Sequence, residues 1–225
     1  MPDGRQVALA DELADRLLAG VIVLDPVTVD TRTGPADAAE VLGASCRQRW
    51  GDAKPGAITE LQDARRLYRS CGMEPTRHRP SSEALLRRVL KGKGLYRINN
   101  LVDSCNLASL TFLLPVGMYD LAQIRGDVIL RLGSASDEYA GIRKGLVHLA
   151  GRLGLFDAEG PFGSPTSDSA RTCTHEGTTA LLAVIMSTPA YGTPAMEAAL
   201  DTFATIFNEH CDADVVYRTV LEGHQ

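Results

Sequence analysis

The sequence predicts an α+β fold, and two observations favour it. Segments with helical spacing of apolar residues dominate the first half of the chain, whereas short apolar or β-branched segments dominate the second half. These segments come in blocks, while a doubly wound sheet would alternate strands with helices. With 225 residues, the chain is long enough to bury a substantial core around both kinds of element.

The first half of the chain is expected to be mainly helical. The segment Val7–Ala19 carries leucines on one side and is followed by Gly20, which predicts a helix with a glycine stop. The β-branched segment Val21–Asp30 predicts a strand near an edge or bend, because Pro26 interrupts it. Further helices are expected from Pro35 with Val41 facing inward, over Ile58–Cys71, from a cap at Ser81 or Ser82, and over Asn99–Phe112.

Short apolar segments separated by glycine and aspartate predict strands in the second half. They are Leu113–Val116, Asp127–Leu132, Gly145–Ala150 and Ala180–Met186. A last helix is expected from Thr193 to Phe207, followed by a final strand over Asp214–Leu221. In the polar segment Ser164–Thr179, eight of sixteen residues are Ser or Thr, so it either cradles a small polar ligand or forms a long surface loop.

The expected helix Asn99–Phe112 carries polar side chains although most of its residues are apolar. Asn99, Asp103 and Asn106 stand at positions i, i+4 and i+7 and therefore share one face. A buried carboxylate or carboxamide without hydrogen bonds destabilises a fold by roughly 1–3 kcal/mol. Two interpretations stay open: these groups tie down neighbouring loops, or they form the floor of a ligand pocket.

Charge is unevenly distributed along the chain. The net charge is −5, yet the segment Arg65–Arg97 carries +8 and the remainder −13. Such segregation predicts a basic face on an acidic body, which suits a phosphate-bearing partner. The alternative is that the helices of this segment simply solvate their outer faces with arginine.

Cysteine usage and hydropathy indicate a cytoplasmic protein. The five cysteines are scattered without a C-x-x-C motif, which is typical of reduced thiols. No signal peptide is expected, and the longest apolar stretch, Leu107–Met118, is too short to span a bilayer. Phosphate-binding loop, dinucleotide-binding, zinc-protease and serine-hydrolase signatures are absent, so neither a metal nor a cofactor is expected.

The segment Ile98-Asn99-Asn100-Leu101-Val102-Asp103-x-x-Asn106 resembles a motif of the B3/4 domain, the editing domain in the β-subunit of bacterial phenylalanyl-tRNA synthetase. The resemblance continues through Leu114–Leu121 and Asp137–Tyr139, and Arg66–Leu85 and Asp157–Thr172 are similar to free-standing members. It implies a β-sheet-rich B3/4-type fold with flanking helices around a central pocket. Residues 1–64 would form an N-terminal extension packed on a main domain over residues 65–225, as one compact unit.

Two positions depart from the synthetase pattern. Where that pattern has Pro-x-His-x-Phe-Asp, this chain has Pro-Val-Gly-Met-Tyr-Asp, so Gly117 replaces the histidine. The glutamate expected after the threonine-rich strand falls near Val184. Binding is therefore better supported by the sequence than catalysis.

The resemblance implies a tRNA-binding protein that hydrolyses mischarged aminoacyl-tRNA, alone or docked on a synthetase. The alternatives are a non-catalytic RNA-binding module and a pocket that senses a free amino acid. The sequence indicates no oligomeric state. An aminoacyl ester is already activated, so a site need only orient a water molecule and stabilise the oxyanion. The catalytic candidates are Asp103 and Glu138 for the water and the backbone at Gly117 for the oxyanion.

The remaining candidates fall into two groups. The substrate-binding candidates are Asn99, Asn100, Asn106, Tyr119, Asp168, Arg171, Thr172 and Thr174. The candidates for contacts with RNA phosphates are Arg65, Arg66, Arg69, Arg79, Arg87, Arg88 and Lys91.

Overall fold

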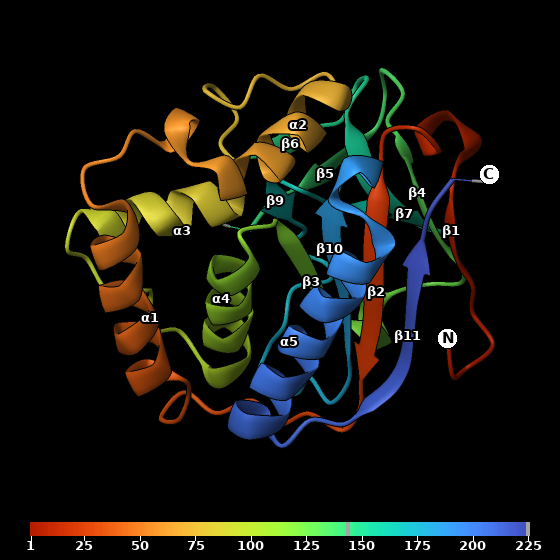
Figure 1. Ribbon diagram of the computed structural model, residues 1–225. Helices are drawn as coiled ribbons and strands as arrows, with labels where there is room; N and C mark the ends of the chain where they lie inside the picture. Colours follow the sequence, from red (N-terminus) through yellow and green to blue (C-terminus); the bar gives the residue numbers. More distant parts are fainter. Residues whose placement is uncertain (143–144, 224–225) are drawn as a thin grey trace.

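A computed structural model describes residues 1–142 and 145–223. Within these residues, helices and two main sheets pack in layers, which confirms the predicted α+β class (Figure 1). One sheet has the strand order β11-β2-β10-β3, the other has the order β1-β4-β7-β8-β9, and β5 and β6 form a separate hairpin.

The elements have the following bounds. The α-helices are α1 (Ala36–Trp50), α2 (Gln62–Ser70), α3 (Ser81–Leu90), α4 (Asn100–Phe112) and α5 (Thr193–Cys211). The first strands are β1 (Val7–Leu9), β2 (Leu18–Leu24), β3 (Val116–Asp120), β4 (Val128–Leu132), β5 (Glu138–Ala140) and β6 (Leu146–His148). The later strands are β7 (Leu153–Asp157), β8 (Gly160–Ser164), β9 (Ser167–Asp168), β10 (Leu181–Ser187) and β11 (Val215–Leu221).

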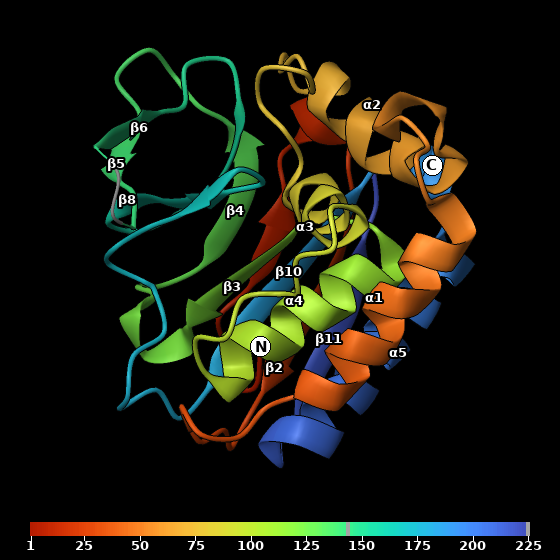
Figure 2. The same cartoon turned by 90° about the vertical axis from the view of Figure 1, so that its left-hand side faces the viewer.

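The four-stranded sheet forms the centre of the molecule. Strands β2 and β10 are buried at every residue, because helices cover one face of the sheet and the five-stranded sheet covers the other (Figure 2). Successive side chains of β2 alternate between the two layers: Ile22 packs in the cluster that contains α5, and Val23 packs with residues of β4 and β7. The N-terminal 64 residues thus supply a central strand of the fold.

The helix predicted over Val7–Ala19 is wrong. The segment forms β1, a short 3₁₀ turn at Asp11–Leu13 and the start of β2. Val7 pairs with Val128 of β4, so a strand partner more than a hundred residues away overrides the local helical spacing. Gly20 lies inside β2, where a side chain would meet Met196 of α5: a Cβ would lie 2.7 Å from its sulfur.

Other elements are of the predicted type but begin or end at different residues. The strand expected at Leu113–Val116 begins only at Val116, because α4 extends to Phe112 and is followed by Leu113 in a left-handed conformation with φ of 59°. The polar segment Ser164–Thr179, for which a ligand cradle and a surface loop were both open, contains the last residue of β8 and all of β9. Val41, expected to face inward, is 71% exposed, and α3 follows Pro80 without a serine cap.

Candidate functional site

The N-terminus of α4 is held by its own asparagines. The side chain of Asn99 accepts a hydrogen bond from the Val102 N–H at 2.9 Å and so caps the helix. The buried Asn100 accepts the Asp30 N–H at 2.8 Å and donates to the Thr28 carbonyl at 2.9 Å. Both side-chain ends of Asn100 are therefore engaged in tying the segment after β2 to α4. For Asn100, the loop-tying interpretation is the one that the geometry supports.

A cavity of about 630 Å³ lies beside α4, and we call it the α4 pocket. Its volume is in the range of small-molecule sites. Its walls come from α4, β3, β9 and the segments around residues 97–98 and 173–174. The polar lining includes Asn99, Asn106, Ser109, Asp168 and Thr174, and the apolar lining includes Leu85, Val102, Val116, Met118 and Ile142. Asn99 and Asn106 therefore line a cavity, as the pocket interpretation requires.

Asp168 gives the α4 pocket its electrostatic character. Burial, followed by the negative charge of Asp168, raises the pKa of Tyr119 well above its usual value and also raises the pKa of Cys105. Burial is likewise the main cause that raises the pKa of Tyr68 and Tyr139, with Asp168 adding to it. These tyrosine and cysteine side chains therefore stay neutral at physiological pH, and Asp168 is the acidic residue among those that line the pocket.

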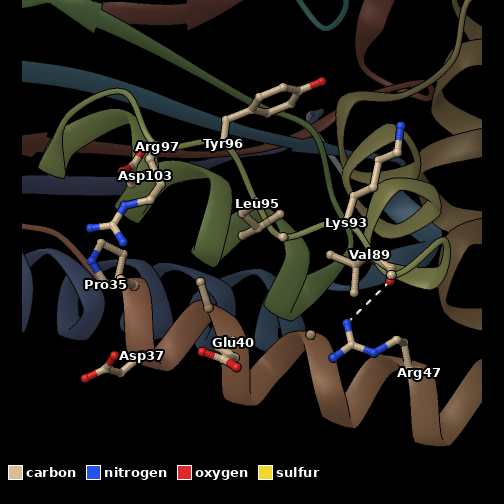
Figure 3. A pocket seen from close by; sticks show the side chains of 15 residues that line it. Pro35, Asp37, Glu40, Arg47, Val89, Lys93, Leu95, Tyr96, Arg97 and Asp103 are labelled. Carbon is tan, nitrogen blue, oxygen red and sulfur yellow. Dashed lines mark hydrogen bonds between the residues drawn. The ribbon is translucent and has the colours of Figure 1, made fainter.

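Asp103 lies outside the α4 pocket, in a second cavity of about 330 Å³ between α1 and the segment before α4 (Figure 3). We call this cavity the α1 groove. Asp103 accepts the Ile98 N–H at 2.9 Å and lies beside Arg97. Burial raises the pKa of Asp103, while the Ile98 hydrogen bond and the Arg97 charge oppose this shift. The three polar groups predicted on one helix face are thus divided between two cavities.

The two other catalytic candidates also lie elsewhere. Glu138 is exposed on β5 and pairs with the His148 Nδ1 at 2.9 Å. Gly117 is packed against the Tyr119 ring, since a Cβ at Gly117 would lie 2.2 Å from the Tyr119 hydroxyl. Neither residue lines the α4 pocket.

The backbone N–H of Gly117 also points away from the position that an oxyanion donor would need. The Leu121 N–H donates to Ala180 beside β10, whereas the Asp120 N–H donates to Thr172 on the opposite side. Because N–H groups alternate along a strand, the Gly117 N–H points toward β10. The Met118 N–H points the other way, off the free edge of β3 and on the strand segment that lines the pocket.

Three further substrate candidates serve the scaffold. Tyr119 is fully buried and packs edge-on against Phe162, with ring centroids 5.0 Å apart. Arg171 forms two 2.9 Å bonds to the Asp157 carboxylate, and the Thr172 hydroxyl donates to the Phe162 carbonyl at 3.2 Å. Of the eight substrate candidates, the α4 pocket brings together Asn99, Asn106, Asp168 and Thr174.

Arg65 is a correction to the predicted phosphate-binding face. Its side chain is buried and donates to the Glu83 carboxylate at 2.9 Å. Arg79 and Arg87 lie 3.9 and 3.7 Å from the same carboxylate. A buried carboxylate needs such partners, because an unpaired buried charge is strongly destabilising. Arg65 is therefore not accessible to a phosphate.

The other basic candidates are on the surface, but some have partners there. Arg66 pairs with Asp63, and the Arg88 guanidinium lies 4.0 Å from the centre of the Tyr96 ring. Arg69 and Lys91 are exposed. The number of cations in this segment thus exceeds the number that is free to bind a partner.

Sequence analysis missed several pocket residues. Cys105 and Ser109 follow Asn99 and Val102 on the same helical stripe, so the 3.6-residue period carried the information needed to find them. Arg97 and Cys173 also line the pocket, and only the fold brings them there.

A histidine–aspartate pair outside the pocket was also missed. His175 lies 3.1 Å from the buried Asp120 carboxylate, and its Nδ1 accepts the Gly177 N–H at 3.0 Å. Both ring nitrogens are therefore occupied, so this pair holds the loop before β10. Searching residues 1–142 and 145–223 for three or more His, Cys, Asp or Glu side chains able to hold a metal ion finds none. In the same stretch, none of the helices has the length and apolarity to cross a membrane.

Comparisons with known proteins point to one family. The family model of the B3/4 domain matches residues 63–211, which is more than half of the chain. The chain is also similar in fold to an N-terminal fragment of the phenylalanyl-tRNA synthetase β-subunit from Pyrococcus horikoshii, with a TM-score of 0.54 and 11% sequence identity. That likeness covers 96% of this chain and 53% of the fragment, so the chain spans about half the fragment's length. No curated protein sequence matches the chain.

Proposed function

The chain belongs to the B3/4 domain family, and from this premise we propose that it binds tRNA and hydrolyses mischarged aminoacyl-tRNA in the α4 pocket. The family itself is confirmed, as the motif around Asn99 and Asn106 predicted. One solved structure with a similar fold is a fragment of a tRNA synthetase subunit, which supports tRNA as the partner of this chain.

The proposal rests mainly on the Asp168 carboxylate, which lies in a pocket with one apolar wall. The Asp168 carboxylate suits the α-ammonium group of an aminoacyl ester, because hydrogen bonds to charged groups are worth about 1.5–3 kcal/mol. Val102 and Met118 offer an apolar wall to the amino-acid side chain.

The reaction requires no covalent nucleophile. A water molecule attacks the ester carbonyl carbon, the bond from that carbon to the ribose oxygen breaks, and a proton from the water passes to the leaving ribose hydroxyl. Free amino acid and uncharged tRNA result. Asn106 and Thr174 supply polar groups that can orient the water, and the Met118 N–H, at the free edge of β3, can donate to the oxyanion.

Deacylation assays with a matched pair of variants test this function. Purified protein is incubated with tRNA pools that carry different mismatched amino acids, and loss of the ester is followed over time. Val102→Phe narrows the α4 pocket beside its apolar wall and should strongly slow deacylation while tRNA binding persists. Val41→Phe adds the same group at a site that is 71% exposed and should retain wild-type activity. A wild-type protein inert on every mischarged tRNA would overturn the proposal.

One observation favours the alternative of a non-catalytic RNA-binding module. The two positions that depart from the synthetase pattern, Gly117 and Val184, pair with each other across β3 and β10. The polar pair of that pattern is thus replaced at both members by groups that cannot orient water. If tRNA binds with high affinity but no ester is lost, this alternative is the function of the chain.

A further inference from the structure

A third cavity, of about 430 Å³, has a lining that carries positive charge and no carboxylate. It lies between the segment before α3 and the β5–β6 hairpin, on the side of the molecule away from α1 (Figure 2). Arg77, Arg79 and Arg152 line it together with His78 and His148. We call it the cationic groove. Thr166 and Ser167 complete the polar part of the lining.

Some of the charges of the cationic groove are available to a ligand. The Arg77 side chain is exposed and forms no ion pair or hydrogen bond with another residue of the described chain. Arg152 makes one long bond of 3.5 Å, to the His148 carbonyl. Arg79 is 3.9 Å from Glu83, and His148 pairs with Glu138 at 2.9 Å. At least two guanidinium groups are therefore free to bind an anion.

The cationic groove is a direct neighbour of the α4 pocket. Ser167 lines the groove and Asp168 lines the pocket, and these two residues make up β9. Successive side chains of a strand point to opposite faces, so the two cavities lie on either side of one short strand. A chain that crosses β9 can place an acyl group in the pocket while its backbone stays in the groove.

We propose that the cationic groove binds the phosphate backbone of the single-stranded 3′ end of tRNA, whose aminoacyl group enters the α4 pocket. This inference rests on the proposed function and adds the surface that would bind the RNA backbone. Arginine suits the task because its planar guanidinium forms paired hydrogen bonds to phosphate oxygens. The lack of carboxylates in the lining favours a polyanion over a zwitterion or a peptide.

The test compares double variants in tRNA binding at several salt concentrations. Arg77→Ala/Arg152→Ala should weaken binding of uncharged tRNA, and of an RNA oligonucleotide ending in CCA, by about 10-fold or more at low salt. The slope of log affinity against log salt should fall by about 1.5, since each lost phosphate contact removes about 0.7–0.9. Arg77→Lys/Arg152→Lys keeps the charge and should retain most of the salt slope.

A matched control removes two cations elsewhere. Arg16 and Lys54 are exposed and line none of the three cavities. Arg16→Ala/Lys54→Ala changes the net charge equally and should leave the affinity within about twofold of wild type. Equal weakening in both double variants would mean that only overall charge matters, and the groove inference would be overturned.

Two further outcomes separate the possible failures. If wild-type protein binds and deacylates tRNA but Arg77→Ala/Arg152→Ala does so equally well, the groove inference falls and the proposed function stands. If wild-type protein binds no tRNA, both fall together. Inorganic phosphate at matched ionic strength should not compete with the oligonucleotide. Effective competition would show that the groove binds a small phosphate compound, and the inference that it binds the RNA backbone would be overturned.

Discussion

The α4 pocket and the α1 groove both adjoin the first turns of α4, and Arg97 lines both, yet their surroundings differ. The pocket has one wall of apolar residues from α4 and β3, and its acidic residue, Asp168, has buried tyrosines around it. The groove sets its own aspartate, Asp103, among charged residues of both signs that are exposed on α1 and on the segment before α4 (Figure 3).

This difference shows why motif position alone does not locate a reactive carboxylate. A charge beside apolar walls acts through a lower local dielectric than a charge at an open, polar surface, so its interactions with a ligand are stronger. Exposed carboxylates such as Asp37 and Glu40 in the α1 groove compete with Asp103 for any cation that enters. Under the proposed function, we therefore expect a substrate ammonium group to bind Asp168 more specifically than Asp103.

The largest expected effect separates the two aspartates by activity. Asp168→Asn keeps the side-chain shape but removes the charge that would hold the substrate ammonium group, so kcat/KM for deacylation should fall about 100-fold. Asp103→Asn, the matched substitution in the α1 groove, should change kcat/KM by less than about threefold. Rates measured on one mischarged tRNA check both variants. A larger loss in Asp103→Asn than in Asp168→Asn would return the catalytic role to Asp103.

The next effect compares the packing of a glycine in β3, the strand that supplies Val116 and Met118 to the α4 pocket, with that of a glycine in the α1 groove. A methyl group at Gly117 would lie 2.2 Å from the Tyr119 hydroxyl, which is buried and cannot move freely, so Gly117→Ala should lower the free energy of unfolding by about 1–3 kcal/mol. Gly43 lies inside α1, where an added Cβ would be 3.4 Å from the end of the Arg47 side chain and from Val89. Gly43→Ala should raise the free energy of unfolding by up to about 1 kcal/mol.

Urea unfolding of both glycine variants measures these changes, with the denaturant slope checked against wild type. If Gly117→Ala leaves the free energy of unfolding unchanged, Tyr119 can leave its position, and the packing around β3 can adjust to a side chain at residue 117. A destabilised Gly43→Ala protein would mean that the α1 groove is packed as closely as the sheet.

Much of the architecture follows from the local pattern of the sequence. The helices α3 and α4 and the strand β10 match their predicted positions, because each combines a strong period with clear turn residues on both sides. The segment containing β1 was misassigned, since its structure depends on pairing with β4, and no local window contains that partner. Long-range pairing is thus what the sequence pattern lacked.

The site was less predictable than the fold for a similar reason. Asn106 and Asp168 share the α4 pocket although they are far apart in sequence, and only the resemblance to a family suggested that they meet. Counting charges overestimated the basic face, because the buried Glu83 draws in Arg65 and stands close to Arg79 and Arg87. A count of cations in a segment does not reveal which of them serve an internal partner.

The smallest expected effect concerns how Asp103 responds to pH. Burial raises the pKa of its carboxyl group in the folded protein, so the folded state binds this proton more tightly than the unfolded state. The resulting contribution to stability is present at acidic pH and is lost as the pH rises through the raised pKa, above the usual value near 4. Asn at this position cannot ionise, yet its carbonyl can still accept the Ile98 N–H. Relative to wild type, Asp103→Asn should therefore gain stability between pH 3 and pH 7, by less than about 1 kcal/mol because the partly exposed carboxyl is screened by solvent.

Urea unfolding at pH 3, 5 and 7 measures the difference, and Asp37→Asn on the exposed face of α1 controls for the change in net charge. A relative stability of Asp103→Asn that falls over this range would show that the Ile98 and Arg97 interactions outweigh burial, and that the aspartate of the α1 groove is held in its charged form.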